Sequence, residues 1–322
     1  MHAVAHTEFS TPDRALRLVD IEIPPPGAGE VRIAVRAAAV GKGDWLVATG
    51  VPYLARPMYG IRRPKEPVAG LEFAGVVDVV GEGVHDVEPG TEVFGWGSGA
   101  FAEFVVVPAD QVAPKPEGVG FDEAAAVPVS GFTALQALRD VAGLQQGQRV
   151  LVIGASGGVG SFAIQIANGL GAEVTGVAST PNVGFVRSLG ADHVVDYTVE
   201  EVTEGDRRFD VIVDIAGNRS IRSLRRILEP GGTLVIVGGS GGRWTMGYGR
   251  TIRAVVTSPF VRQRLRTLIS KPNAEDLGVL AGLMSSGSVA AAVGQRFALV
   301  DAPAAVDLVG TGRSRGKTVV TV

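Results

Sequence analysis

The feature that most constrains the fold lies in residues 149–179. An apolar run, a glycine-rich turn and a periodically apolar segment follow one another there without interruption. Residues 150–153 form a continuous apolar run, which is typical of a parallel strand buried on both faces. Apolar side chains then recur at helical spacing, at Val159, Ala163, Ile166, Ala167 and Leu170. This order predicts a buried strand, a tight turn and an amphipathic helix.

The turn itself favours dinucleotide binding. It reads Ala155-Ser156-Gly157-Gly158-Val159-Gly160, so that alanine stands where the first glycine of G-x-G-x-x-G usually lies. Gly157 lets the backbone approach a pyrophosphate, and Gly160 permits close packing of helix on strand. A second strand is expected at residues 173–178, and this context favours a pyrophosphate site over an ordinary glycine turn. We predict cofactor contacts from Ser156, Gly157, Gly158, Val159 and Gly160.

The end of the second expected strand bears on the choice of cofactor. Binders of the non-phosphorylated dinucleotide usually carry Asp or Glu about 20 residues past the turn, where it holds the ribose 2′-hydroxyl. This chain has Ser179 and Thr180 there, which offer hydroxyl donors and no repelling carboxylate. The pattern favours NADPH. No arginine or lysine follows at Pro181 or Asn182, so a site that accepts both cofactors is the alternative.

Composition excludes several kinds of protein. The 322 residues suggest two domains, and a net charge of −3 argues against broad attraction to nucleic acid or to a membrane surface. Cysteine is absent, which excludes disulfides and thiolate-held zinc, and the four histidines lie far apart. No signal core precedes the first strands and no apolar run reaches the roughly 18 residues of a membrane span. We therefore expect a cytoplasmic protein with no metal.

The pattern of the chain predicts an α/β protein with two domains. Residues 1–124 read as short strands broken by Gly and Pro, residues 125–267 alternate strands with helices, and residues 268–322 return to β character and rejoin the first part. The middle part is expected to form a doubly wound parallel sheet, and Thr133, near the entry to this nucleotide fold, is expected to contact the cofactor. The later strands of the sheet would end at the pairs Ala216-Gly217 and Gly238-Gly239, which either contact the ligand or only form tight turns.

Many segments resemble one known family over almost the whole length. They include AGLEFAGVVDVVGEGVHDVEPGTEVFG, EAAAVPVSGFTALQALRD, GASGGVG, RSLGADHVVDYT, EPGGTLVIVGG, GGRW, SPFVRQRLR, KPNAEDL and RGKTVVTV. On these segments the chain resembles the zinc-independent branch of the medium-chain dehydrogenase/reductase superfamily, the quinone oxidoreductase group. The resemblance implies a GroES-like catalytic domain, a Rossmann domain, NADPH, and a cleft between the domains for hydride transfer.

The resemblance also implies that the catalytic zinc is missing. Zinc-dependent members carry a histidine before the glutamate of a GHE segment, and the matching residues here are Gly70-Leu71-Glu72 in a chain without cysteine. Without a Lewis acid, hydride transfer favours small-molecule acceptors that are already electrophilic, such as quinones and α,β-unsaturated ketones (enones). By the same resemblance, Tyr197 and Lys317 would lie with Ser179 near the 2′-phosphate.

The sequence offers fewer candidates for catalytic residues than for cofactor contacts. Related reductases commonly have asparagine where this chain has Gly41, whereas Asp44 and Trp45 keep the neighbouring pattern. Tyr53 follows in the same segment, and its phenol is either the proton donor to a developing enolate or a side chain that packs at the cleft mouth. Trp96 and Trp244 would line an aromatic acceptor pocket or serve in packing.

Three functions remain open on the sequence. The first is an NADPH-dependent quinone or enone reductase, the second a zinc-independent alcohol or aldehyde dehydrogenase, and the third a non-catalytic NADPH-binding scaffold or sensor. We also expect a homodimer in which an apolar edge strand at residues 254–258 pairs with its copy, beside a helix that carries Arg262, Arg264 and Arg266.

Overall fold

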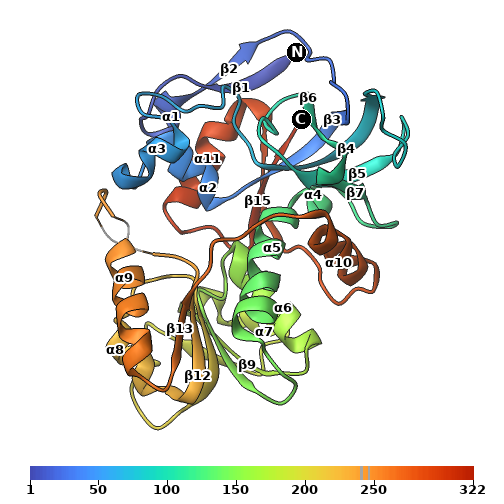
Figure 1. Ribbon diagram of the computed structural model, residues 1–322. Helices are drawn as coiled ribbons and strands as arrows, with labels where there is room; N and C mark the ends of the chain where they lie inside the picture. The colour runs from blue at the N-terminus through green and yellow to red at the C-terminus, as the bar shows by residue number, and fades with distance from the viewer. Residues whose placement is uncertain (240–241, 246) are drawn as a thin grey trace. The chain divides into compact units, whose positions relative to one another are not determined.

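The computed structural model describes residues 1–239, 242–245 and 247–322, which divide into two compact units. Unit 1 comprises Met1–Phe132 and Lys271–Val322, and unit 2 comprises Thr133–Ser270 (Figure 1). Unit 2 is therefore inserted into the chain of unit 1. Each unit has its own sheet and its own apolar core.

Unit 1 is built on a seven-stranded, mainly antiparallel sheet. Its path is β14-β15-β3-β4-β5-β7, with β6 paired to β3, and β1 and β2 form a separate pair. The strands are β1 (His2–His6), β2 (Leu16–Asp20), β3 (Glu30–Val40), β4 (Glu72–Val80), β5 (Glu92–Trp96), β6 (Phe104–Pro108), β7 (Val112–Pro114), β14 (Val293–Ala298) and β15 (Lys317–Thr321).

The helices of unit 1 range from four to twelve residues in length. They are α1 (Pro12–Ala15), α2 (Lys42–Thr49), α3 (Arg56–Tyr59), α4 (Phe121–Ala125), α10 (Ala274–Ser285) and α11 (Ala302–Gly310). Helix α10 begins after Asn273, whose side chain accepts a hydrogen bond from the Asp276 N–H at 2.8 Å, as expected for an N-cap. Helix α5 (Pro128–Gln136) begins in unit 1 and ends in unit 2.

Unit 2 holds a six-stranded parallel sheet in the order β10-β9-β8-β11-β12-β13. The strands are β8 (Arg149–Ile153), β9 (Glu173–Ala178), β10 (His193–Asp196), β11 (Phe209–Asp214), β12 (Leu228–Ile236) and β13 (Arg264–Thr267). The order reverses between β8 and β11, which is the switch point of a doubly wound sheet. The α/β fold class and the parallel sheet expected from the sequence are confirmed.

Helices cover both faces of this sheet, as Figure 1 shows. Helices α6 (Gly158–Gly169) and α7 (Val183–Ser188) lie on one face, and α8 (Ile221–Arg226) and α9 (Tyr248–Thr257) lie on the other. Strand β8 has no exposed residue and only Arg149 is half-buried, which accounts for its continuous apolar run.

The prediction for residues 254–267 was wrong. Residues 254–257 end helix α9, in which Ala254 is buried whereas Val255 and Val256 are exposed. The expected arginine helix is strand β13, because exposed Arg264 and Arg266 flank buried Leu265 with the period of two that a strand requires. Strand β13, and not residues 254–258, forms that edge of the sheet.

No helix in the described residues is both long and apolar enough to cross a lipid bilayer.

Candidate functional site

The glycine turn of unit 2 follows β8 at the switch point of the sheet. Gly154, directly after the strand, has a φ of 91°, so it makes the tight turn that the sequence pattern assigned to the position of Ala155. Gly157 is the N-cap of α6, and Ser156, Gly158 and Val159 are half-buried beside it. The motif is therefore read as Gly154, Gly157 and Gly160 at intervals of three.

Close packing explains why Gly160 has no side chain. A Cβ there would lie 2.1 Å from the Gly154 carbonyl oxygen, whereas a Cβ on Gly157 would meet its nearest atom only at 3.6 Å. Gly160 thus brings α6 against β8, and Gly157 keeps the start of α6 open. The free N–H groups of the first turn of a twelve-residue helix suit a pyrophosphate.

Ser179, Thr180 and Tyr197 come together at the carboxyl ends of β9 and β10. The Tyr197 N–H donates to the Ala178 carbonyl at 3.0 Å, and Asn182 donates to Ser179 Oγ at 3.1 Å. Tyr197 is 53% exposed, so it is accessible to a ligand. These three predicted residues therefore share one end of the sheet.

Asp196 was not expected at this end of the sheet. The Thr180 and Thr198 hydroxyls lie 2.7 Å apart, and Thr198 donates to Asp196 Oδ1 at 2.7 Å. Hydrogen bonds from Thr180 and Thr198 hold the pKa of Asp196 below its usual range, so its carboxylate stays charged. A negative charge at this position would repel the 2′-phosphate of NADPH and so weaken its binding. The residue could have been found from its place as the last residue of a strand neighbouring β9.

The prediction that Lys317 contacts the 2′-phosphate is wrong. Lys317 is the first residue of β15 in unit 1 and is only 2% exposed. Its Nζ donates to Glu72 Oε1 at 2.5 Å and to Ser130 Oγ at 3.1 Å. A buried ammonium committed to a carboxylate is not available to a phosphate of a solvent-borne ligand.

The strand register of unit 1 brings these charges together. Strand β3 ends where β4 and β15 begin, with Ala38 opposite Phe73 and Val40 opposite Thr318. Glu72 and Lys317 are therefore neighbours at that end of the sheet. The Val129 N–H donates a hydrogen bond to the other carboxylate oxygen, Glu72 Oε2, at 2.8 Å.

Asp44 lies beside this pair and is 4% exposed. Its Oδ2 accepts the Gly41 N–H at 2.7 Å, which caps the start of α2. Burial, and to a smaller extent the neighbouring Glu72 carboxylate, raises the pKa of Asp44 to about 7, against the lowering effects of that hydrogen bond and of the Lys317 ammonium. Asp44 can therefore hold a proton near neutral pH while it fixes the first turn of α2.

The residues at Glu72 do not fit a catalytic zinc. Both carboxylate oxygens are engaged, by Lys317 and by the Val129 N–H, and the chain supplies no thiolate. Within the part of the chain that the structure describes, no three His, Cys, Asp or Glu side chains are grouped as metal ligands would be.

The two predicted glycine pairs pack against each other at the ends of β11 and β12. A Cβ on Gly217 would lie 2.6 Å from Gly239 Cα, and a Cβ on Gly238 would lie 2.0 Å from the Ile215 carbonyl oxygen. Gly217 also has a φ of 65°. Backbone contact, in addition to turn geometry, therefore requires glycine at both positions. Ala216, directly before Gly217, is half-buried.

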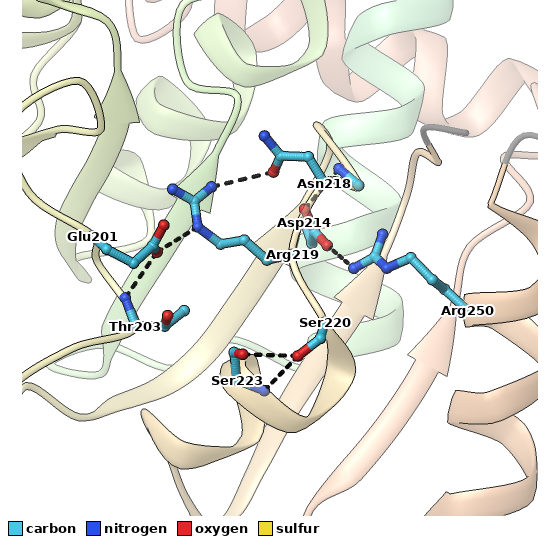
Figure 2. A network of polar contacts seen from close by, with 9 residues as sticks. Glu201, Thr203, Asp214, Asn218, Arg219, Ser220, Ser223 and Arg250 are labelled. Carbon is cyan, nitrogen blue, oxygen red and sulfur yellow. Dashed lines mark hydrogen bonds and ion pairs between the residues drawn. The ribbon is translucent and has the colours of Figure 1, made fainter. Parts of the chain in front are cut away.

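A polar network surrounds the end of β11, shown in Figure 2. Asp214, the last residue of the strand, is fully buried and accepts the Gly217 N–H at 2.9 Å and a hydrogen bond from Arg250 Nη2. Arg219 donates to Glu201 at 2.7 Å and to Asn218 at 3.2 Å. The Asp214–Arg250 pair was not predicted, because the two residues are 36 positions apart and Arg250 lies in a segment with no recognised motif.

Gly41, Tyr53 and Trp45 lie in unit 1. A Cβ on Gly41 would lie 3.7 Å from Asp44 Oδ2 and 4.0 Å from Glu72 Oε1, so there is room for a side chain. Tyr53 is half-buried, with the Arg56 guanidinium 4.6 Å from its ring centre. Trp45 packs on the apolar core of the unit, with Lys42 Nζ 4.1 Å from its ring centre.

The remaining predicted residues differ in exposure. Trp96 packs edge-on against Phe132, with ring centres 5.2 Å apart, and Trp244 is 68% exposed. Thr133 is half-buried in α5 and is the first residue of unit 2. Gly241 of the GGRW segment lies outside the described residues.

A pocket of about 440 Å³ lies at the opposite end of the parallel sheet. Its lining includes Arg149, Glu173, His193 and Phe209, the first residues of β8, β9, β10 and β11. Ligands of open parallel sheets bind at the carboxyl ends of the strands, so we place the candidate site at the glycine turn and not in this pocket.

These features define a class of protein with two units, in which a parallel sheet of the dinucleotide-binding type is inserted into a β-rich unit. Comparison with known proteins agrees. The alcohol dehydrogenase GroES-like domain matches residues 27–117, and a domain described as zinc-binding dehydrogenase matches residues 189–320.

Individual relatives match almost the whole chain. The chloroplast envelope quinone oxidoreductase homolog of Arabidopsis thaliana is 31% identical, over 99% of this chain and 98% of that protein. The quinone oxidoreductase of Coxiella burnetii has a similar structure, with a TM-score of 0.87 and 30% identity over 100% of this chain and 99% of that one. A structure described as an NAD-dependent alcohol dehydrogenase is also similar, with a TM-score of 0.85 and 30% sequence identity over 100% of both chains.

The chain belongs to the medium-chain dehydrogenase/reductase family, in its quinone oxidoreductase-like group of NAD(P)H-dependent oxidoreductases. The GroES-like unit and the Rossmann sheet expected from the sequence are thereby confirmed.

Proposed function

We propose that this protein transfers a hydride from NADPH to a quinone or an α,β-unsaturated carbonyl compound. The observation that carries the proposal is the turn of Gly154, Gly157 and Gly160 at the switch point of the unit 2 sheet. A turn at the switch point, with no side chains at these three residues, lets the backbone approach the pyrophosphate of a dinucleotide.

The residues of this turn and of the neighbouring strand ends would hold the cofactor. The first N–H groups of α6 would hold the pyrophosphate, and Ser179, Thr180 and Tyr197 lie at the end of the sheet where the adenine ribose would bind. The absence of a carboxylate at the end of β9 supports NADPH. Because Asp196 is charged nearby and Lys317 is committed elsewhere, we expect the preference over NADH to be modest.

The residues around Glu72 in unit 1 indicate which kind of substrate accepts the hydride. When bound, a nicotinamide dinucleotide supplies the hydride, and the residues around Glu72 provide no fitting zinc site to polarise an alcohol. An acceptor that is already electrophilic suits such a site. We propose that the Tyr53 phenol donates the proton to the enolate, and that Asp44 positions α2, which precedes Tyr53 in the chain.

An alcohol dehydrogenase is the second candidate, supported by the likeness to the NAD-dependent alcohol dehydrogenase structure. The purified protein separates the two when turnover is measured with NADPH and a panel of quinones and enones, and with NADP⁺ and simple alcohols, both with a chelator present. Turnover of the first panel alone supports our proposal. Oxidation of alcohols alone would replace it with the second candidate, and NADPH binding without any turnover would favour a scaffold or sensor.

We also propose a homodimer. Strand β13 is one of the two edges of the unit 2 sheet, and pairing with the same edge of a second copy would extend both sheets. This surface replaces residues 254–258 of the sequence prediction.

A further inference from the structure

Arg250 combines a buried guanidinium with donors that the protein does not use. Its side chain is 17% exposed, and Nη2 donates to the fully buried Asp214 carboxylate. Nε and Nη1 are buried and find no hydrogen-bond partner among the described residues. Buried donors are unfavourable without an acceptor, so two unpaired nitrogens on one side chain indicate that oxygen atoms of another molecule bind there.

Arg219 offers a useful contrast within the same network. Its side chain is 10% exposed, but its Nε and Nη1 both have acceptors, on Glu201 and Asn218 (Figure 2). The equivalent two nitrogens of Arg250 are the unpaired ones. Burial of an arginine at this end of the sheet therefore does not by itself leave donors unpaired.

Asp214 accounts for the position of Arg250 but not for its spare donors. One carboxylate oxygen accepts the Gly217 N–H and the other accepts Arg250 Nη2, so the carboxylate is compensated and the guanidinium is anchored. An anchored guanidinium is preorganised for further hydrogen bonds, because little rotamer freedom remains to be lost.

The topology identifies the ligand that reaches this position. In a doubly wound sheet the two halves of a dinucleotide lie on either side of the switch point. The turn after β8 and the ends of β9 and β10 belong to the adenine side, so Asp214 at the end of β11 belongs to the nicotinamide side. Glycine pairs end the neighbouring turns, and no long side chain stands at 216–217 or 238–239 to block a ligand.

We propose that Arg250 binds oxygen atoms of the nicotinamide mononucleotide half of the cofactor through Nε and Nη1. The inference rests on the proposed function, and it adds a cofactor contact from α9 that is independent of the glycine turn. Asp214 is the positioning residue that orients the guanidinium.

The test uses Arg250→Lys, which keeps a cation opposite Asp214 and removes the spare donors. Arg253→Lys, on the exposed face of the same helix, is the matched control. Binding of NADPH and of adenosine 2′,5′-bisphosphate is measured by calorimetry, and the nicotinamide fluorescence of bound NADPH is recorded. Thermal unfolding of each variant reports on the fold.

Arg250→Lys should weaken NADPH binding about tenfold, leave adenosine 2′,5′-bisphosphate binding unchanged and alter the nicotinamide fluorescence. Arg253→Lys should change none of these. Unchanged NADPH binding in Arg250→Lys, or equal weakening of both ligands, would overturn the inference while leaving the proposed function intact. Failure of the wild-type protein to bind NADPH would overturn the proposed function and this inference with it.

Discussion

Replacing Lys317 by methionine should destabilise the protein without changing its choice of cofactor. The substitution leaves the Glu72 carboxylate, 1% exposed, without its cation. Removing one partner of a buried ion pair costs about 3–5 kcal/mol. For a unit of the size of residues 1–132 with 271–322, this corresponds to a fall in Tm of about 6–20 °C.

The fall in Tm caused by Lys317→Met should depend on pH. Burial raises the pKa of Glu72 above its ordinary value of 4.5, and the nearby Lys317 ammonium lowers it, so removal of the ammonium raises this pKa further. A carboxyl group whose pKa is raised by folding contributes stability that is present below its unfolded pKa and is lost as the pH rises through the folded pKa. The Tm deficit of Lys317→Met should therefore be larger at about pH 8 than at about pH 5.

Calorimetric melting checks the magnitude, and the double variant Glu72→Gln/Lys317→Met is the control. It removes both charges and keeps an oxygen for the Val129 N–H, so most of the lost stability should return. The ratio of NADPH to NADH affinity should stay at the wild-type value in the single variant. A normal Tm together with selective loss of NADPH binding would refute the buried-pair assignment and restore Lys317 as a phosphate ligand.

Four further outcomes are expected. Ser179→Asp should reverse the NADPH preference through repulsion of the 2′-phosphate, and Asp196→Asn should strengthen NADPH binding; calorimetry that shows NADH bound equally or better by the wild type would contradict the cofactor proposal. Tyr53→Phe should lower turnover of enones more than of quinones, whose reduced oxygens take protons from water, and equal effects would remove Tyr53 from the mechanism. Light scattering should give twice the mass of one chain, whereas a monomer at micromolar concentration would contradict pairing through β13.

The sequence predicted local features well where one short segment contains all of the evidence. The apolar run of β8, the glycine turn and the α6 periodicity are adjacent in the chain, and the structure keeps them adjacent. Residues 254–267 were misread because helix α9 exposes Val255 and Val256, so their apolar character does not indicate a buried strand.

Long-range charge pairing could not be predicted in the same way. Lys317 and Glu72 are 245 positions apart and meet because β15 and β4 both flank β3. The partner of a charged side chain depends on strand order and register, which the sequence leaves open. The same limitation applies to the Asp214–Arg250 pair, whose members are 36 positions apart.

The most direct test of the central claim follows the hydride itself. The protein is incubated with an enone and NADPH that carries deuterium at C4, using each of the two C4 stereoisomers in turn, with a chelator present. Mass spectrometry should find deuterium at the β-carbon of the reduced product with one stereoisomer and not with the other. Reduced product without deuterium from either stereoisomer, or no turnover of any enone or quinone by protein that binds NADPH, would contradict hydride transfer as the function of this chain.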